Sequence, residues 1–255
     1  MSGHSKWHNI QARKGKQDAK RSSGFTKVAK MITIAAQKGG DPAANFSLRL
    51  AIDKAKEVSM PKDNIDRAIK RGTGEDGEGM QMEEVLYEAF GPGGIAVLVK
   101  AVTDNKNRTL SDLKHILSKH GGSFAGAGSV SWMFAQRGVV TIPLSLVRQA
   151  QSALSTSREA QGGVGRDELE LTLIDAGAED ISESDDEIEI KTKVENLQKV
   201  INKLRELSIE PKESGVRWVA KDIVQIPKET EEKVAELFGE LEANDDVEDY
   251  YTNAE

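Results

Sequence analysis

Apolar side chains recur at three- and four-residue steps through residues 18–72, after an opening stretch without such a period. The first apolar stripe begins near Asp18 and predicts a helix that Gly39 and Gly40 end. Its members are Phe25, Val28, Ile32 and Ala35. Residues 1–17 carry several cations, no acid and no apolar period, so we expect a poorly ordered basic arm there.

Two further helices are expected before the pattern changes. One runs from Asp41 to about Val58, with Asp41 as its N-cap and the following proline at the first helical position. The next is short, opens at Pro61 and is closed by Gly72. Residues 18–72 therefore predict a small domain made only of helices.

The pattern changes at residues 73–81, which are rich in glycine and acidic side chains and so predict a boundary. Beyond them the apolar period becomes two or continuous, which is typical of strands. The expected elements are strands at 85–87 and 95–99, a helix at 108–120 and a strand at 130–134. This order indicates a layer of helix on sheet.

A second set of elements begins after Gly138. We expect strands at 139–142, 179–182 and 187–191, and helices at 144–157, 167–175 and 194–207. The tail then supplies a strand at 216–226, a helix at 228–241 and a strand at 247–251. Because the first set lacks a second helix and a last strand, which the tail can provide, we expect one domain to be inserted into the other.

The predicted fold is therefore α+β, with a small all-α domain of three helices followed by two α+β domains, the third inserted into the second. The expected boundaries are a flexible arm at 1–17, the helical domain at 18–72, an α+β domain at 73–138 plus 216–255, and the inserted α+β domain at 139–215.

The amino-acid composition excludes several classes of protein and of functional site. Hydrophobic residues make up 38% of the 255 residues, which suffices for packed cores. The absence of cysteine excludes disulfides, thiolate metal sites and a cysteine nucleophile. No apolar run has the length of a signal peptide core or of a membrane span, so we expect a cytoplasmic protein without a membrane partner.

Charge is divided unevenly along the chain. Residues 1–72 hold 16 Lys and Arg against 6 Asp and Glu, although the whole chain has a net charge of −7. A phosphate backbone responds to the local field, which decays within roughly 8–10 Å at physiological salt. The asymmetry therefore indicates nucleic acid as a partner, despite the acidic overall balance.

The arm and the first helix carry the candidate nucleic-acid contacts. Cations release counterions from phosphates, and the indole of Trp7 offers a face on which a base can stack. In the arm and just after it, the candidates are Lys6, Trp7, His8, Arg13, Lys14, Lys16, Lys20 and Arg21; on the polar face of the helix they are Lys27 and Lys30. The alternative is that Trp7 only pins the arm to its own domain and that the lysines are solvated.

A second polar cluster, TDNKNRT at 103–109, follows an expected strand and precedes an expected helix. Such a position often holds polar function. The possible second surface comprises Thr103, Asp104, Asn105, Asn107 and Arg108. The alternative is helix capping and turn chemistry alone, which these residue types also serve.

No signature of catalysis, of a metal or of a cofactor is present. The GxG within residues 121–129 lies after a helix and before a strand, whereas a dinucleotide fingerprint needs the opposite order. His4 and His8 have a spacing that suits zinc on a helix but lack a third ligand nearby. The acidic residues 240–255 either solubilise the chain or compete with nucleic acid for the arm.

Several long motifs in one order closely resemble the YebC/PmpR family. They are GHSKWHNIQARK at 3–14, MPKDNIDRAIKRGTG at 60–74, TDNKNRT, and GGSFAGAGSVSWMF at 121–134. The resemblance covers nearly the whole chain and implies the same three-domain organisation. One departure is the segment 155–166, which looks longer and more polar than is expected of the family.

The resemblance implies a function without an enzymatic step. Members are described as DNA-binding transcriptional regulators and as ribosome-associated factors that help translation through difficult sequences such as proline runs. The family's opening motif matches Lys6, Trp7, His8, Asn9, Arg13 and Lys14, and its central motif matches Asp104, Asn105, Asn107 and Arg108. We therefore expect a nucleic-acid-binding regulator of transcription, with an RNA- or ribosome-associated translation factor as the alternative and a purely protein-binding module as a third class. The oligomeric state stays open.

Overall fold

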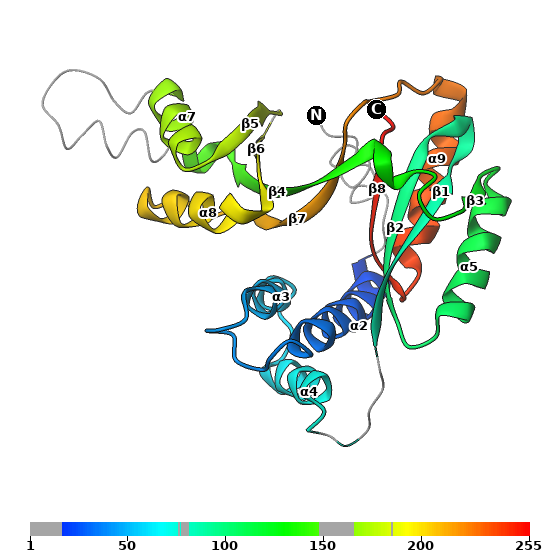
Figure 1. Ribbon diagram of the computed structural model, residues 1–255, viewed down its shortest axis with the longest axis horizontal. Coiled ribbons are helices and arrows are strands. Elements are labelled where there is room, and N and C mark those ends of the chain that lie inside the picture. The colour runs from blue at the N-terminus through cyan, green and yellow to red at the C-terminus, as the bar shows by residue number, and fades with distance from the viewer. Residues whose placement is uncertain (1–16, 76, 78–81, 148–165, 185) are drawn as a thin grey trace, which may run out of the picture. The chain divides into compact units, whose positions relative to one another are not determined.

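The computed structural model describes residues 17–75, 77, 82–147, 166–184 and 186–255, with side chains described from residue 24 and, after the long gap, from residue 169 (Figure 1). These residues form two compact units. One unit holds Ala135–Val219, and the other holds the described residues before and after that segment. Residues 1–16 of the arm expected at 1–17, and most of the helix expected at 144–157, lie outside the described residues, although 144–147 are helical and Gln17 begins a helix.

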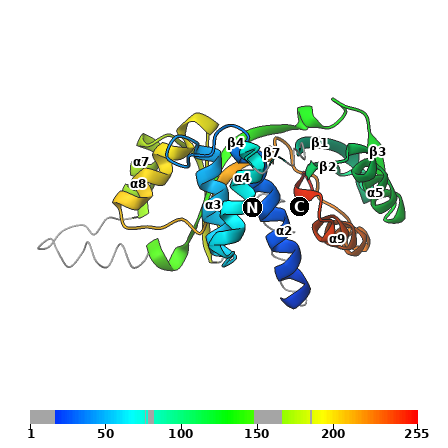
Figure 2. The same ribbon diagram turned by 90° about the horizontal axis from the view of Figure 1, so that it is seen from below.

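Three helices form the N-terminal domain: α2 (Gln17–Ala36), α3 (Phe46–Glu57) and α4 (Lys62–Thr73). Both α3 and α4 pack on α2, as Figures 1 and 2 show, and they contact each other much less than either contacts α2. The buried core contains the predicted stripe of α2 together with aliphatic side chains of the other two helices, among them Val28, Ile32, Leu48, Ala51, Ile65 and Ala68.

The second helix begins later than the sequence predicts. Asp41 accepts a hydrogen bond from Ala43 N at 2.9 Å, but this contact belongs to a turn. Asn45 is the N-cap of α3, since its side-chain oxygen accepts from Leu48 N at 3.1 Å. The amide of Asn45 also donates to Ala35 O at 2.8 Å, which joins the start of α3 to the end of α2. This tertiary bond explains why the cap lies at Asn45.

Gly72 does not close α4, contrary to the prediction. The helix continues to Thr73, and Gly74, with a φ of 79°, is the left-handed C-cap. Gly72 instead lies against α2, where an added Cβ would sit 2.3 Å from Thr33 O. The hydroxyl of Thr33 donates to Ala68 O at 3.2 Å, so the two helices approach closely along this line.

The first sheet is antiparallel and has the order β3-β1-β2-β8. Its strands are β1 (Glu83–Phe90), β2 (Ala96–Thr103), β3 (Ser123–Ala125) and β8 (Val247–Thr252). Helices α5 (Lys106–Lys119) and α9 (Lys228–Ala243) cover one face (Figures 1 and 2). Their apolar sides and that face form one core, which includes Val97, Val99, Leu113, Leu117, Phe238 and Tyr250. The tail therefore supplies a helix and a strand to the earlier domain, as predicted.

The second sheet has the order β5-β6-β4-β7. Its strands are β4 (Phe134–Pro143), β5 (Ala178–Glu183), β6 (Glu187–Thr192) and β7 (Glu213–Ala220), and its helices are α7 (Arg166–Asp175) and α8 (Leu197–Glu206). Short 3-10 turns occur at η1 (Pro92–Gly94), η2 (Ser131–Met133) and η3 (Val194–Asn196). The α+β class with the third domain inserted into the second is confirmed, while the domain boundaries stay predictions.

Two details of the strands differ from the prediction. The strand expected at 130–134 is a turn, η2, that leads into β4, and the three-residue strand β3 was not foreseen. The strand expected at 216–226 ends at Ala220, because the following residues form only a single bridge, between Val224 and Ala254.

Candidate nucleic-acid interface

The expected interface begins in a part of the chain that the structure does not describe. Its first candidates, Lys6, Trp7, His8, Asn9, Arg13, Lys14 and Lys16, all lie outside the described residues. Lys20 and Arg21 belong to α2, in its first part, whose side chains are not described. Their contacts with a ligand stay a prediction.

Lys27 and Lys30 lie against the 242–246 segment, which links α9 to β8. Lys27 Nζ donates to the carbonyl oxygen of Glu242. Lys30 Nζ lies 2.6 Å from the carboxylate of Asp246 and 3.0 Å from the carbonyl oxygen of Asp245, with its side chain only 15% exposed. Burial lowers the pKa of Lys27, against the opposing effect of nearby acids. Both lysines therefore hold α2 on the α+β domain, and a phosphate would have to displace these bonds.

Other cations of the helical domain face solvent. The ends of α2 and α4 converge, because Gly40 lies beside Thr73. The exposed cations near this end and along α4 are Lys38, Lys62, Arg67, Lys70 and Arg71. No ion pair between described residues involves any of them. The patterns described above did not single out the four on α4, although the spacing of Arg67, Lys70 and Arg71 opposite the apolar stripe of that helix was a usable signal.

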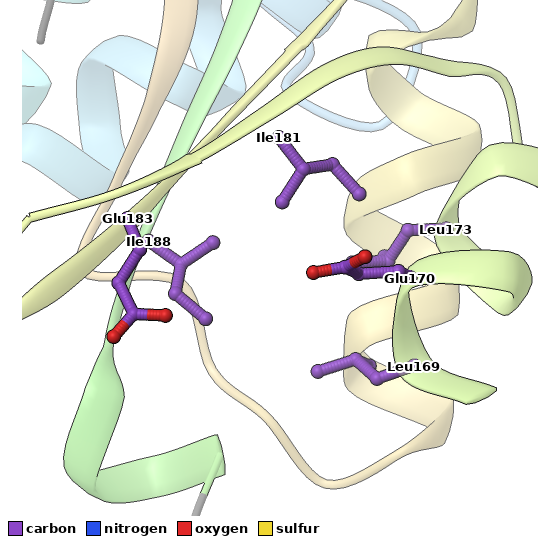
Figure 3. A pocket seen from close by; sticks show the side chains of 6 residues that line it. All are labelled: Leu169, Glu170, Leu173, Ile181, Glu183 and Ile188. Atoms are coloured by element: carbon purple, nitrogen blue, oxygen red, sulfur yellow. The ribbon is translucent and has the colours of Figure 1, made fainter. Parts of the chain in front are cut away.

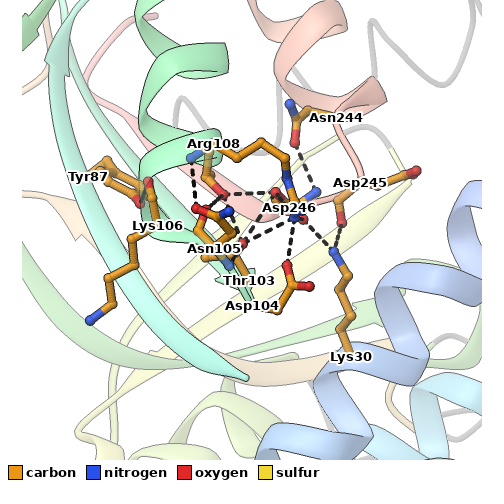
Figure 4. A network of polar contacts seen from close by, with 11 residues as sticks. Lys30, Tyr87, Thr103, Asp104, Asn105, Lys106, Arg108, Asn244, Asp245 and Asp246 are labelled. Atoms are coloured by element: carbon orange, nitrogen blue, oxygen red, sulfur yellow. Dashed lines mark hydrogen bonds and ion pairs between the residues drawn. The ribbon is translucent and has the colours of Figure 1, made fainter. Parts of the chain in front are cut away.

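A network of polar contacts surrounds Asp246 (Figure 4). Its carboxylate, 7% exposed, accepts hydrogen bonds from Thr109 Oγ1 at 2.8 Å and from Arg108 Nη2 at 3.0 Å, in addition to Lys30. Burial tends to raise the pKa of Asp246, but the bonds from Lys30, Thr109 and Arg108 outweigh it and hold the pKa below its ordinary value. Asp246 is therefore a buried anion that joins α2, α5 and β8.

The polar cluster at 103–109 supplies the other side of this network. Asn105 caps α5 by accepting from Arg108 N at 3.1 Å, while the buried Thr103 hydroxyl accepts from Asn105 N at 2.9 Å. Arg108 bonds to Asp246 at 3.0 Å and to Asp104 at 2.8 Å, and these two carboxylates raise the pKa of its guanidinium. Asn107 is exposed. The cluster thus caps α5 and pairs with Asp246, and Arg108 keeps about half of its side chain in solvent.

A third feature is the loop that leads from β3 into β4, which includes the end of the glycine-rich segment 121–129. The carboxylate of Glu88 on β1 accepts hydrogen bonds from three backbone N–H groups, those of Gly128, Val130 and Ser131. Burial alone would raise the pKa of Glu88, but the three bonds outweigh it and lower the pKa. An ionised, buried carboxylate therefore fixes the shape of this loop.

The described residues offer little room for a small molecule or a metal. A pocket in the inserted domain, lined by Leu169, Leu173, Ile181 and Ile188 among others, has space for about one water molecule (Figure 3). Within the described part of the chain, no group of three or more His, Asp or Glu residues is placed to hold a metal ion. None of the helices described there is long and apolar enough to cross a membrane.

The protein thus belongs to a class in which a basic helical domain is followed by two α+β domains, one inserted into the other. The chain belongs to the TACO1/YebC family. The family model for the TACO1/YebC N-terminal domain matches residues 5–75, and that for the second and third domain matches residues 82–254.

Curated relatives share the whole length of the chain. Proteins named "Probable transcriptional regulatory protein" from Pseudothermotoga lettingae and Maridesulfovibrio salexigens are 45% and 46% identical to it. Each alignment covers 100% of this chain, and 94% and 96% of the respective relative. A crystal structure of a conserved hypothetical protein from Aquifex aeolicus matches with a TM-score of 0.80 and 38% identity, covering 94% of this chain and 92% of that one.

Proposed function

We propose that this protein is a non-enzymatic, cytoplasmic regulator that acts by binding nucleic acid, with duplex DNA as the target and transcription as the process controlled. The observation that carries the proposal is the concentration of cations in residues 1–72 of an acidic protein. The names of its relatives support a role in the regulation of transcription.

The binding surface is formed by the basic arm with the start of α2, and the exposed cations of α4 extend it. Lys27 and Lys30 join this surface only when the 242–246 segment releases them, because they bond to Glu242, Asp245 and Asp246. Thr103, Asp104 and Asn105 act mainly by placing Arg108, which contacts a phosphate with its exposed side. The exposed Asn107 is a further candidate contact.

A second candidate is a translation factor that binds RNA or the ribosome. The observation that favours it is that the exposed cations of the helical domain, among them Lys38, Arg67, Lys70 and Arg71, can meet a phosphate backbone, while the sequence shows no clear helix-turn-helix spacing.

The salt dependence of binding tests the direct phosphate contacts. Replacing Lys6, Arg13, Lys14 and Lys16 together with Ala is expected to reduce the log–log salt slope by up to about 2.8–3.6, since each of four lost phosphate contacts removes about 0.7–0.9. A matched control replaces Lys199 and Lys203 of α8 with Ala, which is expected to leave the slope unchanged. An unaltered slope in the arm variant would show that those cations do not contact phosphate.

Sedimentation separates the two targets. Cell lysate is resolved on sucrose gradients at low and high salt, with the full chain beside a form that lacks residues 1–20. Co-migration with ribosomes that is sensitive to salt and requires the arm supports the translation factor. A protein that stays at the top of both gradients, yet binds duplex DNA in vitro, supports the transcriptional regulator.

A further inference from the structure

Trp132 lies on the loop that Glu88 fixes and is 62% exposed, an unusual degree of exposure for an indole. The two residues that bracket η2, Val130 and Phe134, are buried and anchor the loop to the domain. The sequence analysis gave Trp132 no role, and neither the core nor the polar network around Asp246 includes it.

The indole is held in place by the loop itself. Its Nε1–H donates to Ser129 O at 3.0 Å, so the only hydrogen-bond donor of the ring is already used. The Trp132 carbonyl accepts from Lys221 Nζ at 2.7 Å, and the backbone N–H of Lys221 donates to Met133 O at 2.9 Å. A ligand that meets this ring therefore finds a flat apolar surface without a free donor.

This preorganisation lowers the cost of binding. An exposed side chain ordinarily loses about 0.5–1.5 kcal/mol of rotamer freedom when a partner immobilises it. Here the hydrogen bond of the ring to Ser129 and the three N–H bonds to Glu88 impose that order before a ligand arrives. The Glu88 carboxylate thus holds in place the loop on which the exposed Trp132 lies.

The neighbouring cation identifies the class of ligand. Lys221 is exposed, and an ammonium group has three N–H donors, of which the carbonyl of Trp132 uses one. A flat π surface beside a cation matches a nucleotide, whose base stacks on the ring while its phosphate meets the ammonium. The base must be unpaired, because the faces of a base within a duplex are already covered by its neighbours.

We propose that Trp132 and Lys221 form a stacking site for one unpaired nucleotide, separate from the basic arm. The inference rests on the nucleic-acid binding proposed above, in its RNA- or ribosome-associated form, because an intact DNA duplex presents no unpaired base. Trp132 supplies the stacking surface, Lys221 supplies the phosphate contact, and Glu88 positions the loop.

The test measures binding of the full-length protein to a labelled 12-nucleotide oligouridylate and to a 12-base-pair duplex at low salt. Trp132→Ala is expected to weaken oligouridylate binding between about fivefold and 150-fold, the range of one lost stacking contact. Trp132→Phe is expected to recover most of the affinity, and duplex binding is expected to stay unchanged. Leu171→Ala is the matched control, because Leu171 is also 62% exposed and offers no ring.

A spectroscopic readout reports on the ring directly. In a variant with Trp7→Phe and Trp218→Phe, Trp132 is the remaining tryptophan, and oligouridylate is expected to quench its emission. Binding that requires the arm but neither quenches Trp132 nor weakens in Trp132→Ala overturns this inference and leaves the proposed function standing. A wild-type protein that binds neither probe overturns both.

Discussion

The buried carboxylate of Asp246 makes a quantitative prediction about how the helical domain is held. It accepts hydrogen bonds from Lys30, Thr109 and Arg108, and its side chain is 7% exposed. A hydrogen bond to a charged group is worth about 1.5–3 kcal/mol, and removing one member of a buried ion pair costs about 3–5 kcal/mol. Lys30 and Arg108 keep 15% and 48% of their side chains in solvent, which compensates part of that loss. We therefore expect Asp246→Asn to lower the free energy of unfolding by about 2–4 kcal/mol.

Urea unfolding followed by circular dichroism measures this change. The matched control is Glu83→Gln, which breaks an ion pair with Lys106 in which both side chains are 53% exposed, and it is expected to cost less than about 1 kcal/mol. A double variant with Lys30→Met isolates the pairwise coupling. The reasoning is refuted when Asp246→Asn costs no more than the control, or when the two single losses simply add.

Three further predictions concern the same domains. Folding lowers the pKa of Asp246, so its contribution to the free energy of unfolding is present above its unfolded-state pKa and is lost as the pH falls through the folded value. Between about pH 5 and pH 2 the wild type should therefore lose more stability than Asp246→Asn. Gly72→Ala should destabilise the helical domain by more than about 1 kcal/mol, because the new Cβ would meet Thr33 O. Gly24→Ala, in open space on α2, should stabilise it by about 0.4–1 kcal/mol. Thermal unfolding measures both changes. Glu88→Gln should speed amide hydrogen exchange in the loop that it holds, and unchanged protection would show that the charge is dispensable.

Local patterns predicted most of the helices and strands, because burial imposes a period of 3.6 or 2 on the residues themselves. The insertion of one domain into the other was predictable for a simpler reason. The first set of elements lacked a helix and a strand, and the tail of the chain could provide both. The start of α3 at Asp41 and the closing role of Gly72 were predicted wrongly, because contacts with α2 decide both: Asn45 bonds to Ala35, and Gly72 lies against Thr33. β3 was missed because three residues are too few to show a period.

Less of the candidate nucleic-acid interface could be predicted from the sequence. The excess of Lys and Arg in residues 1–72 identified the cationic end of the protein. Residues 1–16 of the arm, however, lie outside the described residues. The bonds of Lys27 and Lys30 to the 242–246 segment join residues about 215 positions apart, and no local pattern encodes such a contact. The role of Glu88 was hidden for the same reason, because its partners lie some 40 residues later.

The placement of β8 and α9 has a consequence for how the protein matures during synthesis. Both elements are made after the inserted domain, whose own strands and helices are contiguous in the chain. Until they emerge, the side of β2 that pairs with β8 has no partner strand, and the core around Val97 is incomplete. The contacts of α2 with the 242–246 segment cannot form either. The inserted domain is therefore expected to fold while the nascent chain is still growing, and the first sheet to follow it, with a slow step set by the closure of its long-range contacts.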